Sequence, residues 1–189
     1  MQRGFNATIY VNHLDVIDPT WFQHGSVPRK TLIDKLTTQR KHKEDLNVVR
    51  QTNALIPFLK LGGHVKFCNM TVRLFKNYFK QGIPILTGLS ATYLYGCARE
   101  TFSAEGQSTY DDINGTPCGH FVVLCGYDEK KKRIVVADPH RENPLSHDNY
   151  YKVSISRLIN AILLGVLTLD GNLLIIQPNK DVHANNSGD

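Results

Sequence analysis

The stretch GTPCGHFVVLCGYD, residues 115–128, contains an apolar run that opens with a histidine, His120. A second apolar run, RIVVADP at residues 133–139, follows the charged linker EKKK at residues 129–132. β-Branched and aromatic residues favour strands, and a short charged linker favours an exposed turn, so the two runs predict an antiparallel hairpin. The histidine then lies near the start of the first strand.

The register of this hairpin brings His120 close to an acid. With the turn centred near residue 129 or 130, His120 faces Asp138 or Pro139, or lies one step diagonal to His140. Sheet neighbours on one face are within contact range. The Asp138 carboxylate can then accept from one ring nitrogen and leave the other nitrogen as a general base. Such a pair is the base half of a nucleophilic triad.

Other interpretations of these residues stay open. A histidine at the end of a strand also occurs as a structural residue whose ring nitrogens are hydrogen-bonded. An aspartate before a proline commonly starts a turn. A metal site would combine His120 with Cys118, His140 and His147. Their spacing matches no established zinc pattern, so we predict no metal and no cofactor.

The rest of the chain predicts helices followed by strands. In chain order we expect a strand at 7–14, a turn at 17–22, a helix at 31–61 that breaks within 37–46, a helix at 71–82, strands from 83–95 onward, a helix at 154–165 and a last strand at 172–178. N-terminal helices followed by an antiparallel sheet make an α+β fold. We expect one domain over residues 1–178 and a disordered tail at 179–189, which has nothing to bury.

Composition excludes several classes of protein. The chain has 189 residues, of which 41% are hydrophobic and 21% charged, and its net charge is +5. The basic residues lack the interleaved aromatic residues of a nucleic-acid platform, and no apolar run is long enough for a membrane span. The four cysteines form no CxxC pair, which is typical of a reducing compartment. We therefore expect a cytoplasmic protein without nucleic-acid or membrane partners.

Several stretches resemble one family of enzymes. GHFVVLCGYD and IVVADP resemble the histidine and aspartate strands of papain-like cysteine peptidases, specifically the bacteriocin-processing (double-glycine leader) peptidase type. The resemblance covers most of residues 3–178 through RGFNATIYV, DPTWF, GIPILTGLSATYLY and DDINGTPCGHFVV. It implies a papain-like fold and hydrolysis of a peptide or amide bond. His120 would be the base and Asp138 the residue that orients it.

The family's nucleophile has no clear counterpart in this sequence. In such peptidases it is a cysteine at the start of a helix, preceded by a glutamine, and the helix dipole lowers the pKa of the thiol. No Q…C segment precedes Gly4, so we expect the first lobe to be truncated. Cys118, two residues before His120, and Cys68, three residues before the helix start at Thr71, are the candidate replacements. Expected cleft-lining residues are Ser90, Thr92, Gly119 and Asp112.

Three functions follow as hypotheses. The first is a cysteine peptidase-like hydrolase that works on a peptide or protein substrate if the nucleophile is supplied. The second is a catalytically inactive binding module, or pseudoenzyme, in which a protein partner covers the apolar face that the missing lobe leaves exposed. The third is nucleotide chemistry, because plant-type guanylyl cyclases contain a strand similar to residues 119–128.

Overall fold

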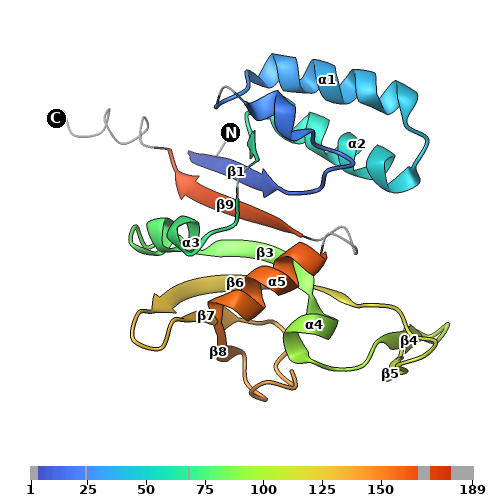
Figure 1. The fold of residues 1–189 in the computed structure, drawn as a ribbon, viewed down its shortest axis with the longest axis vertical. Helices are drawn as coiled ribbons and strands as arrows, with labels where there is room; N and C mark the ends of the chain where they lie inside the picture. The colour runs from blue at the N-terminus through green and yellow to red at the C-terminus, as the bar shows by residue number, and fades with distance from the viewer. Residues whose placement is uncertain (1–3, 24, 68, 166–170, 180–189) are drawn as a thin grey trace. The chain divides into compact units, whose positions relative to one another are not determined.

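The computed structural model describes residues 4–23, 25–67, 69–165 and 171–179. The chain divides into two compact units. Unit 1 comprises Met1–Cys68 with Leu174–Asp189, and unit 2 comprises Asn69–Leu173. Figure 1 shows the elements of both units, which together make an α+β fold.

Unit 1 packs two helices with a small set of strands. Its elements are β1 (Phe5–Val11), the 3₁₀ helix η1 (Pro19–Phe22), α1 (Arg29–His42), α2 (Leu46–Lys60), β2 (His64–Lys66) and most of β9 (Asn172–Pro178). The strand order is β2-β1-β9, and β1 pairs with β2 in parallel. The helix predicted at 31–61 is interrupted within the predicted stretch 37–46 and forms two helices, α1 and α2. The break occurs where the Asp45 side chain accepts from the amides of Asn47 and Val48 and so caps α2, as Asp commonly does.

Unit 2 contains an antiparallel sheet with the order β3-β6-β7-β8. Its elements are α3 (Val72–Phe79), β3 (Ile85–Ser90), α4 (Ala91–Tyr95), β4 (Glu100–Phe102), β5 (Ser108–Tyr110), β6 (Gly119–Asp128), β7 (Arg133–Ala137), β8 (Tyr150–Ser154) and α5 (Ile155–Leu164). β4 and β5 form a separate hairpin. The predicted hairpin at 115–139 is β6 and β7, and the predicted antiparallel sheet is confirmed.

The two faces of this sheet differ in their cover. One row across the four strands, Ile85–Leu124–Val136–Tyr151, is buried, and α5 packs on this face (Figure 1). The neighbouring row, Leu86–Val123–Ala137–Tyr150, faces the other way, with Leu86 37% and Tyr150 62% exposed. Neighbours along a strand alternate between faces, so His120, two residues before Val122, lies on the helix-covered face.

The segment 83–95 differs from its prediction as a strand. β3 ends at Ser90, whose side chain accepts from the amide of Tyr93 and starts α4. Gly96, with a φ of 71°, then ends the helix in the left-handed region, where glycine meets no steric penalty. The β-branched and aromatic composition of the segment favoured a strand, but the serine cap and the glycine stop enclose a single helical turn. This turn carries Tyr95.

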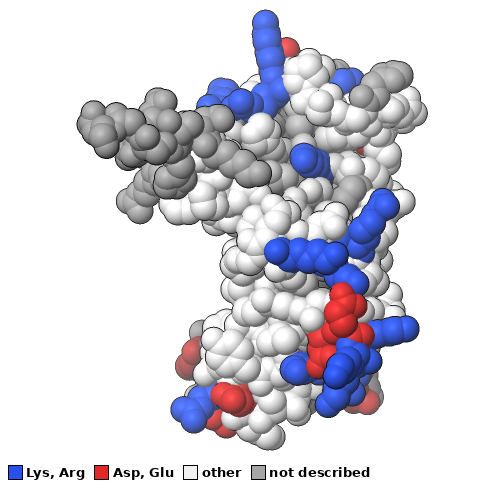
Figure 2. Space-filling model, turned by 90° about the vertical axis from the view of Figure 1, so that its left-hand side faces the viewer, with Lys and Arg blue, Asp and Glu red and all other residues white. Residues whose placement is uncertain are grey.

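Charged side chains of both signs share the surface of unit 2. Lys76 pairs with Glu129 at 2.5 Å, and Lys152 pairs with Asp128 at 3.1 Å. Figure 2 shows one face of the molecule, on which basic side chains are scattered and, at the lower end, lie among acidic ones. In the described part of the chain, no helix combines the length and apolar character needed to cross a bilayer.

Candidate active site

His120 lies near the start of β6, opposite Leu89 of β3. Its side chain is 22% exposed, so the imidazole is mostly packed but still reaches solvent. The β6–β7 ladder ends at the pair Val123–Ala137, because β7 stops there. His120 thus faces no residue of β7 directly, and its contact with the acid is made by side chains alone.

Asp138 follows β7 and turns its carboxylate toward His120. The distance from His120 Nε2 to Asp138 Oδ1 is 2.7 Å, and Asp138 is only 2% exposed. Asn149 fixes the backbone of Asp138 on both sides. The Asp138 amide donates to the Asn149 carbonyl at 2.8 Å, and the Asn149 side-chain amide donates to the Asp138 carbonyl at 2.7 Å. The structure therefore brings the two predicted residues together, with the backbone of Asp138 hydrogen-bonded to Asn149.

The Asp138 carboxylate accepts three further hydrogen bonds. The amide of His140 donates to Oδ1 at 2.8 Å, while the hydroxyls of Tyr95 and Tyr151 donate to Oδ2 at 2.7 and 2.6 Å. Burial alone would raise the pKa of Asp138, but the hydrogen bonds from His120, Tyr151, Tyr95 and the His140 amide outweigh burial and lower it. The buried carboxylate is therefore held in its charged form.

These contacts determine which ring nitrogen of His120 carries the proton in the neutral imidazole. An ionised carboxylate only accepts hydrogen bonds, so Nε2 of His120 must be the donor. In the neutral ring the proton is then on Nε2, and Nδ1 carries a lone pair. Such a ring can take a proton from a nucleophile through Nδ1 while the carboxylate stabilises the cation that forms. Chemically, this arrangement could act as a general base with its orienting acid.

The cysteine thiols are placed less favourably for the role of nucleophile than His120 and Asp138 are for the roles of base and orienting acid. Cys118 lies immediately before β6, and its amide donates to Thr92 Oγ1 at 2.9 Å. Its Sγ donates to the Gly119 carbonyl at 3.5 Å. Cys125 is exposed at the irregularity in β6. The other candidate thiol, Cys68, lies outside the described residues.

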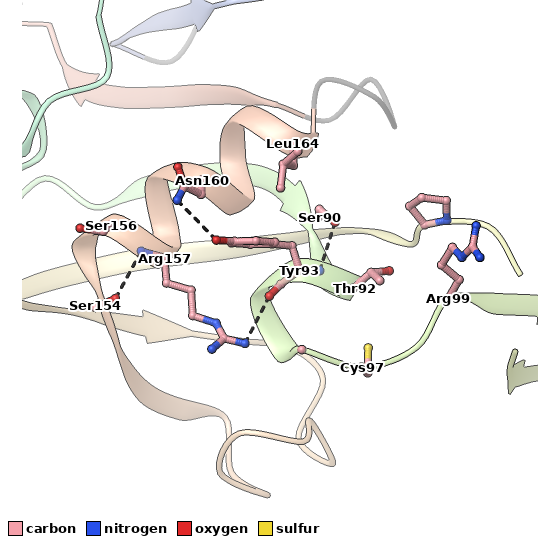
Figure 3. Close-up of a pocket in the computed structure, with 12 residues that line it drawn as sticks. Ser90, Thr92, Tyr93, Cys97, Arg99, Ser154, Ser156, Arg157, Asn160 and Leu164 are labelled. Atoms are coloured by element: carbon pink, nitrogen blue, oxygen red, sulfur yellow. Dashed lines mark hydrogen bonds between the residues drawn. The ribbon is translucent and has the colours of Figure 1, made fainter. Parts of the chain in front are cut away.

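A pocket of about 820 Å³ opens beside α4 and α5 (Figure 3). The predicted cleft residues Ser90 and Thr92 line it, together with Cys97. Gly119 and Asp112 are not among its lining residues. Gly119 instead begins β6, and the Asp112 carbonyl accepts from the Arg99 guanidinium.

Hydrogen bonds fix the helix ends at this pocket. Arg157 of α5 donates from Nε to the Leu94 carbonyl at 2.8 Å and from Nη2 to the Tyr93 carbonyl at 3.3 Å. Figure 3 shows the Arg157 side chain reaching from α5 toward α4. Because α4 also carries Tyr95, the same contacts hold the phenol that donates to Asp138.

Sequence reasoning missed Tyr95 and Tyr151. One signal for Tyr151 is present in YYKVS, where alternation points every second residue of a strand into the core, and a buried tyrosine hydroxyl needs a partner. Tyr95 gave no such signal, because it ends a helix of five residues, which is too short to show a period. The alternative metal set was not assembled either: among the described residues, no three His, Cys, Asp or Glu side chains gather into a group that could hold a metal ion.

Comparisons with known proteins complete the description of the site. The model of the Peptidase_C39 like family matches residues 60–159, a range that includes both His120 and Asp138. Among solved structures, one described as a C39-like peptidase from Bacillus anthracis is 19% identical, with a TM-score of 0.34. The match covers 59% of this chain and 50% of that one. No curated protein gives a significant match.

Proposed function

Since the chain belongs to the Peptidase_C39 like family, we propose that His120 and Asp138 are the base half of a cysteine-peptidase site that hydrolyses peptide or amide bonds. The observation that carries the proposal is the 2.7 Å contact between His120 Nε2 and the buried Asp138 Oδ1. It leaves Nδ1 of a partly exposed ring as the base.

The proposed reaction follows from this proton arrangement. Nδ1 of His120 takes the proton of a cysteine thiol, and the thiolate attacks the carbonyl carbon of the substrate. The imidazolium then gives its proton to the leaving amine, and a thioester forms. Water, activated by the same nitrogen, cleaves the thioester and restores the thiol. Asp138 keeps its charge throughout and stabilises the imidazolium.

The source of the thiol is part of the proposal. Cys118 lies close to His120 in sequence, but its amide and Sγ are both engaged by the chain that surrounds it. It also lacks the helix N-terminus that normally activates a catalytic thiol. We infer that the nucleophile is supplied from outside the described residues, by Cys68 or by polypeptide beyond this chain.

Thiol reactivity tests this function. Iodoacetamide labelling followed by mass spectrometry, between about pH 5 and pH 9, measures the rate at each cysteine. The proteins compared are the wild type, His120→Ala and a control, His42→Ala, which changes an exposed histidine at the end of α1 in unit 1. The measurement includes the longer polypeptide if the gene encodes one.

The expected result is one thiol that reacts quickly near pH 6 and slows in His120→Ala but not in His42→Ala. If every thiol reacts only above about pH 8, as unperturbed thiols do, the peptidase proposal is overturned. Binding of GTP in a titration would contradict it as well and would favour nucleotide chemistry.

The second candidate function is an inactive binding module. The observation that favours it is the row Leu86–Val123–Ala137–Tyr150, which presents apolar side chains on the face opposite α5. Phe121, 54% exposed, extends this surface along β6. Contiguous exposed apolar residues commonly mark a surface for a protein partner. Loss of thiol activation together with binding of a protein at this surface would support this candidate.

A further inference from the structure

We propose that Tyr95 and Tyr151 are positioning residues, which fix the rotation of the Asp138 carboxylate so that Oδ1 alone receives His120 Nε2. This inference rests on the proposed function above. It adds two side chains that have no place in the simple scheme of nucleophile, base and acid.

The geometry separates the two carboxylate oxygens. Oδ2 accepts both phenols, at 2.7 Å from Tyr95 and 2.6 Å from Tyr151. Oδ1 accepts His120 Nε2 at 2.7 Å and the His140 amide at 2.8 Å. A carboxylate has about four lone-pair sites, so these four bonds saturate it. Any rotation of the carboxylate about its Cβ–Cγ bond must break bonds on both oxygens together.

The two phenols come from different parts of unit 2. Tyr95 is the last residue of α4, and Tyr151 lies in β8 at the edge of the sheet. Both side chains converge on a carboxylate that follows β7. A clamp assembled from a helix and a strand holds the carboxylate from two directions, which a single neighbouring residue could not do.

The two phenol hydroxyls also stabilise the negative charge of Asp138, a role that a lysine or arginine commonly has beside a buried carboxylate. The one ion pair that Asp138 makes within the described residues is with His120. A buried carboxylate without compensation would become neutral. Burial and the bond to Asp138 raise the pKa of both tyrosines well above the ordinary value, so the phenols remain protonated donors at working pH. They therefore keep Asp138 charged without adding a positive group that would compete with the imidazolium.

A merely structural role for the phenols predicts a different outcome. Tyr→Phe keeps the ring and its packing and removes only the O–H. If the hydroxyls serve only stability, their loss lowers the melting temperature and leaves the His120 ring unchanged. If they position Asp138, the carboxylate gains freedom to rotate, and the preference for the proton on Nε2 weakens.

The test is ¹⁵N NMR of the histidine rings, which reports the proton position on His120 directly. Samples are the wild type, Tyr95→Phe, Tyr151→Phe and the double variant. The matched control is Tyr150→Phe, which changes the adjacent, 62% exposed tyrosine on the opposite face of β8. Amide spectra check that each variant is folded, and the single variants carry the test if the double variant does not fold.

We expect a single Nε2–H tautomer in the wild type and in Tyr150→Phe. In the tyrosine variants the tautomer ratio falls by about tenfold, the size of one hydrogen bond to a charged group. An unchanged ratio in folded variants overturns the positioning role and leaves the proposed function intact. Absence of thiol activation with a changed ratio would overturn the proposed function and leave the clamp intact.

Discussion

At the residue scale, Asp138 is the group on which the site depends. It is buried, carries no lysine or arginine partner among the described ion pairs, and accepts four hydrogen bonds from three side chains and one amide. Charge-assisted bonds of this kind are stronger than neutral ones, and a missing acceptor leaves each buried donor unpaired. Substitutions here should therefore change both stability and the protonation of His120.

Asp138→Asn is expected to lower the free energy of unfolding by about 2–3 kcal/mol. The asparagine side chain has one oxygen that can accept hydrogen bonds from the four donors now facing the carboxylate. Its NH₂ group is itself a donor, so it cannot pair with the donors that face it. Urea denaturation measures the change. Asp112→Asn, at an exposed aspartate, is the control and should stay within about 0.5 kcal/mol of the wild type. Equal stability of the two variants would contradict this account of Asp138.

The lowered pKa of Asp138 also makes stability depend on pH. Its folded-state pKa lies below the unfolded value of about 3.9. The stabilisation is therefore complete above about pH 4 and is lost as the pH falls toward the folded-state pKa. The stability gap between wild type and Asp138→Asn should be largest above about pH 4 and shrink below it. Chemical denaturation at a series of pH values measures the gap, and a gap that widens on acidification would argue against a charged Asp138.

The sequence allowed the His120–Asp138 pair to be predicted, because a hairpin relates its two strands by local register. It did not allow the position of the pair in the ladder to be predicted. The irregularity between Leu124 and Gly126 shifts the register, and β7 ends at Ala137. The tyrosines were not predictable from the hairpin, since α4 and β8 reach Asp138 only through tertiary packing.

At the element scale, the short helix α4 links the fold to the site. Ser90 caps it, Gly96 ends it, and its last residue, Tyr95, donates to Asp138. Arg157 of α5 binds the carbonyls of Leu94 and Tyr93 and so secures its C-terminal end. A five-residue helix has little stability of its own, so these end contacts determine whether Tyr95 stays in place.

Ser90→Ala is expected to destabilise the protein by about 1 kcal/mol, the usual cost of losing an N-cap. The amide of Tyr93 would lose its acceptor, the Ser90 hydroxyl. Ser156→Ala is the control, because this exposed serine lies within α5 and makes no cap. Thermal or urea unfolding of both variants measures the difference. A Ser90→Ala protein as stable as the Ser156→Ala protein would show that the cap contributes nothing.

The helices show where sequence patterns are sufficient. The helices predicted at 71–82 and 154–165 are α3 and α5, and they are capped by Thr71 and Ser154. α4 lacked that length of pattern, since a single turn contains too few residues to show a helical period. The predicted disorder of the tail stays a prediction, because residues 180–189 lie outside the described residues.

At the scale of the whole molecule, unit 2 has a core on one face of its sheet and apolar side chains on the other. The buried row is packed by α5, whereas Leu86, Phe121 and Tyr150 are 37%, 54% and 62% exposed. This asymmetry bears on the binding-module candidate, since contiguous exposed apolar side chains commonly mark a surface for a protein partner.

Phe121→Ser should reduce the binding of an apolar dye. The aromatic ring is a large part of the exposed apolar surface around Val123, and its removal leaves less area for 8-anilinonaphthalene-1-sulfonate. We expect dye fluorescence to fall about twofold or more while far-UV circular dichroism is unchanged. The control is Leu46→Ser, which changes a residue of unit 1 that is 81% exposed. Equal fluorescence in the two variants would mean that this face does not act as a continuous apolar surface.

The ¹⁵N spectrum of His120 in the wild type and in Asp138→Asn decides whether the buried carboxylate sets the proton position on the imidazole. In the wild type we expect the neutral form of the ring to carry its proton on Nε2 and to leave Nδ1 open, and in the variant we expect this preference to be lost. A wild-type proton on Nδ1, or a spectrum unaffected by the change at Asp138, would contradict the assignment of His120 and Asp138 as a general base and its orienting acid.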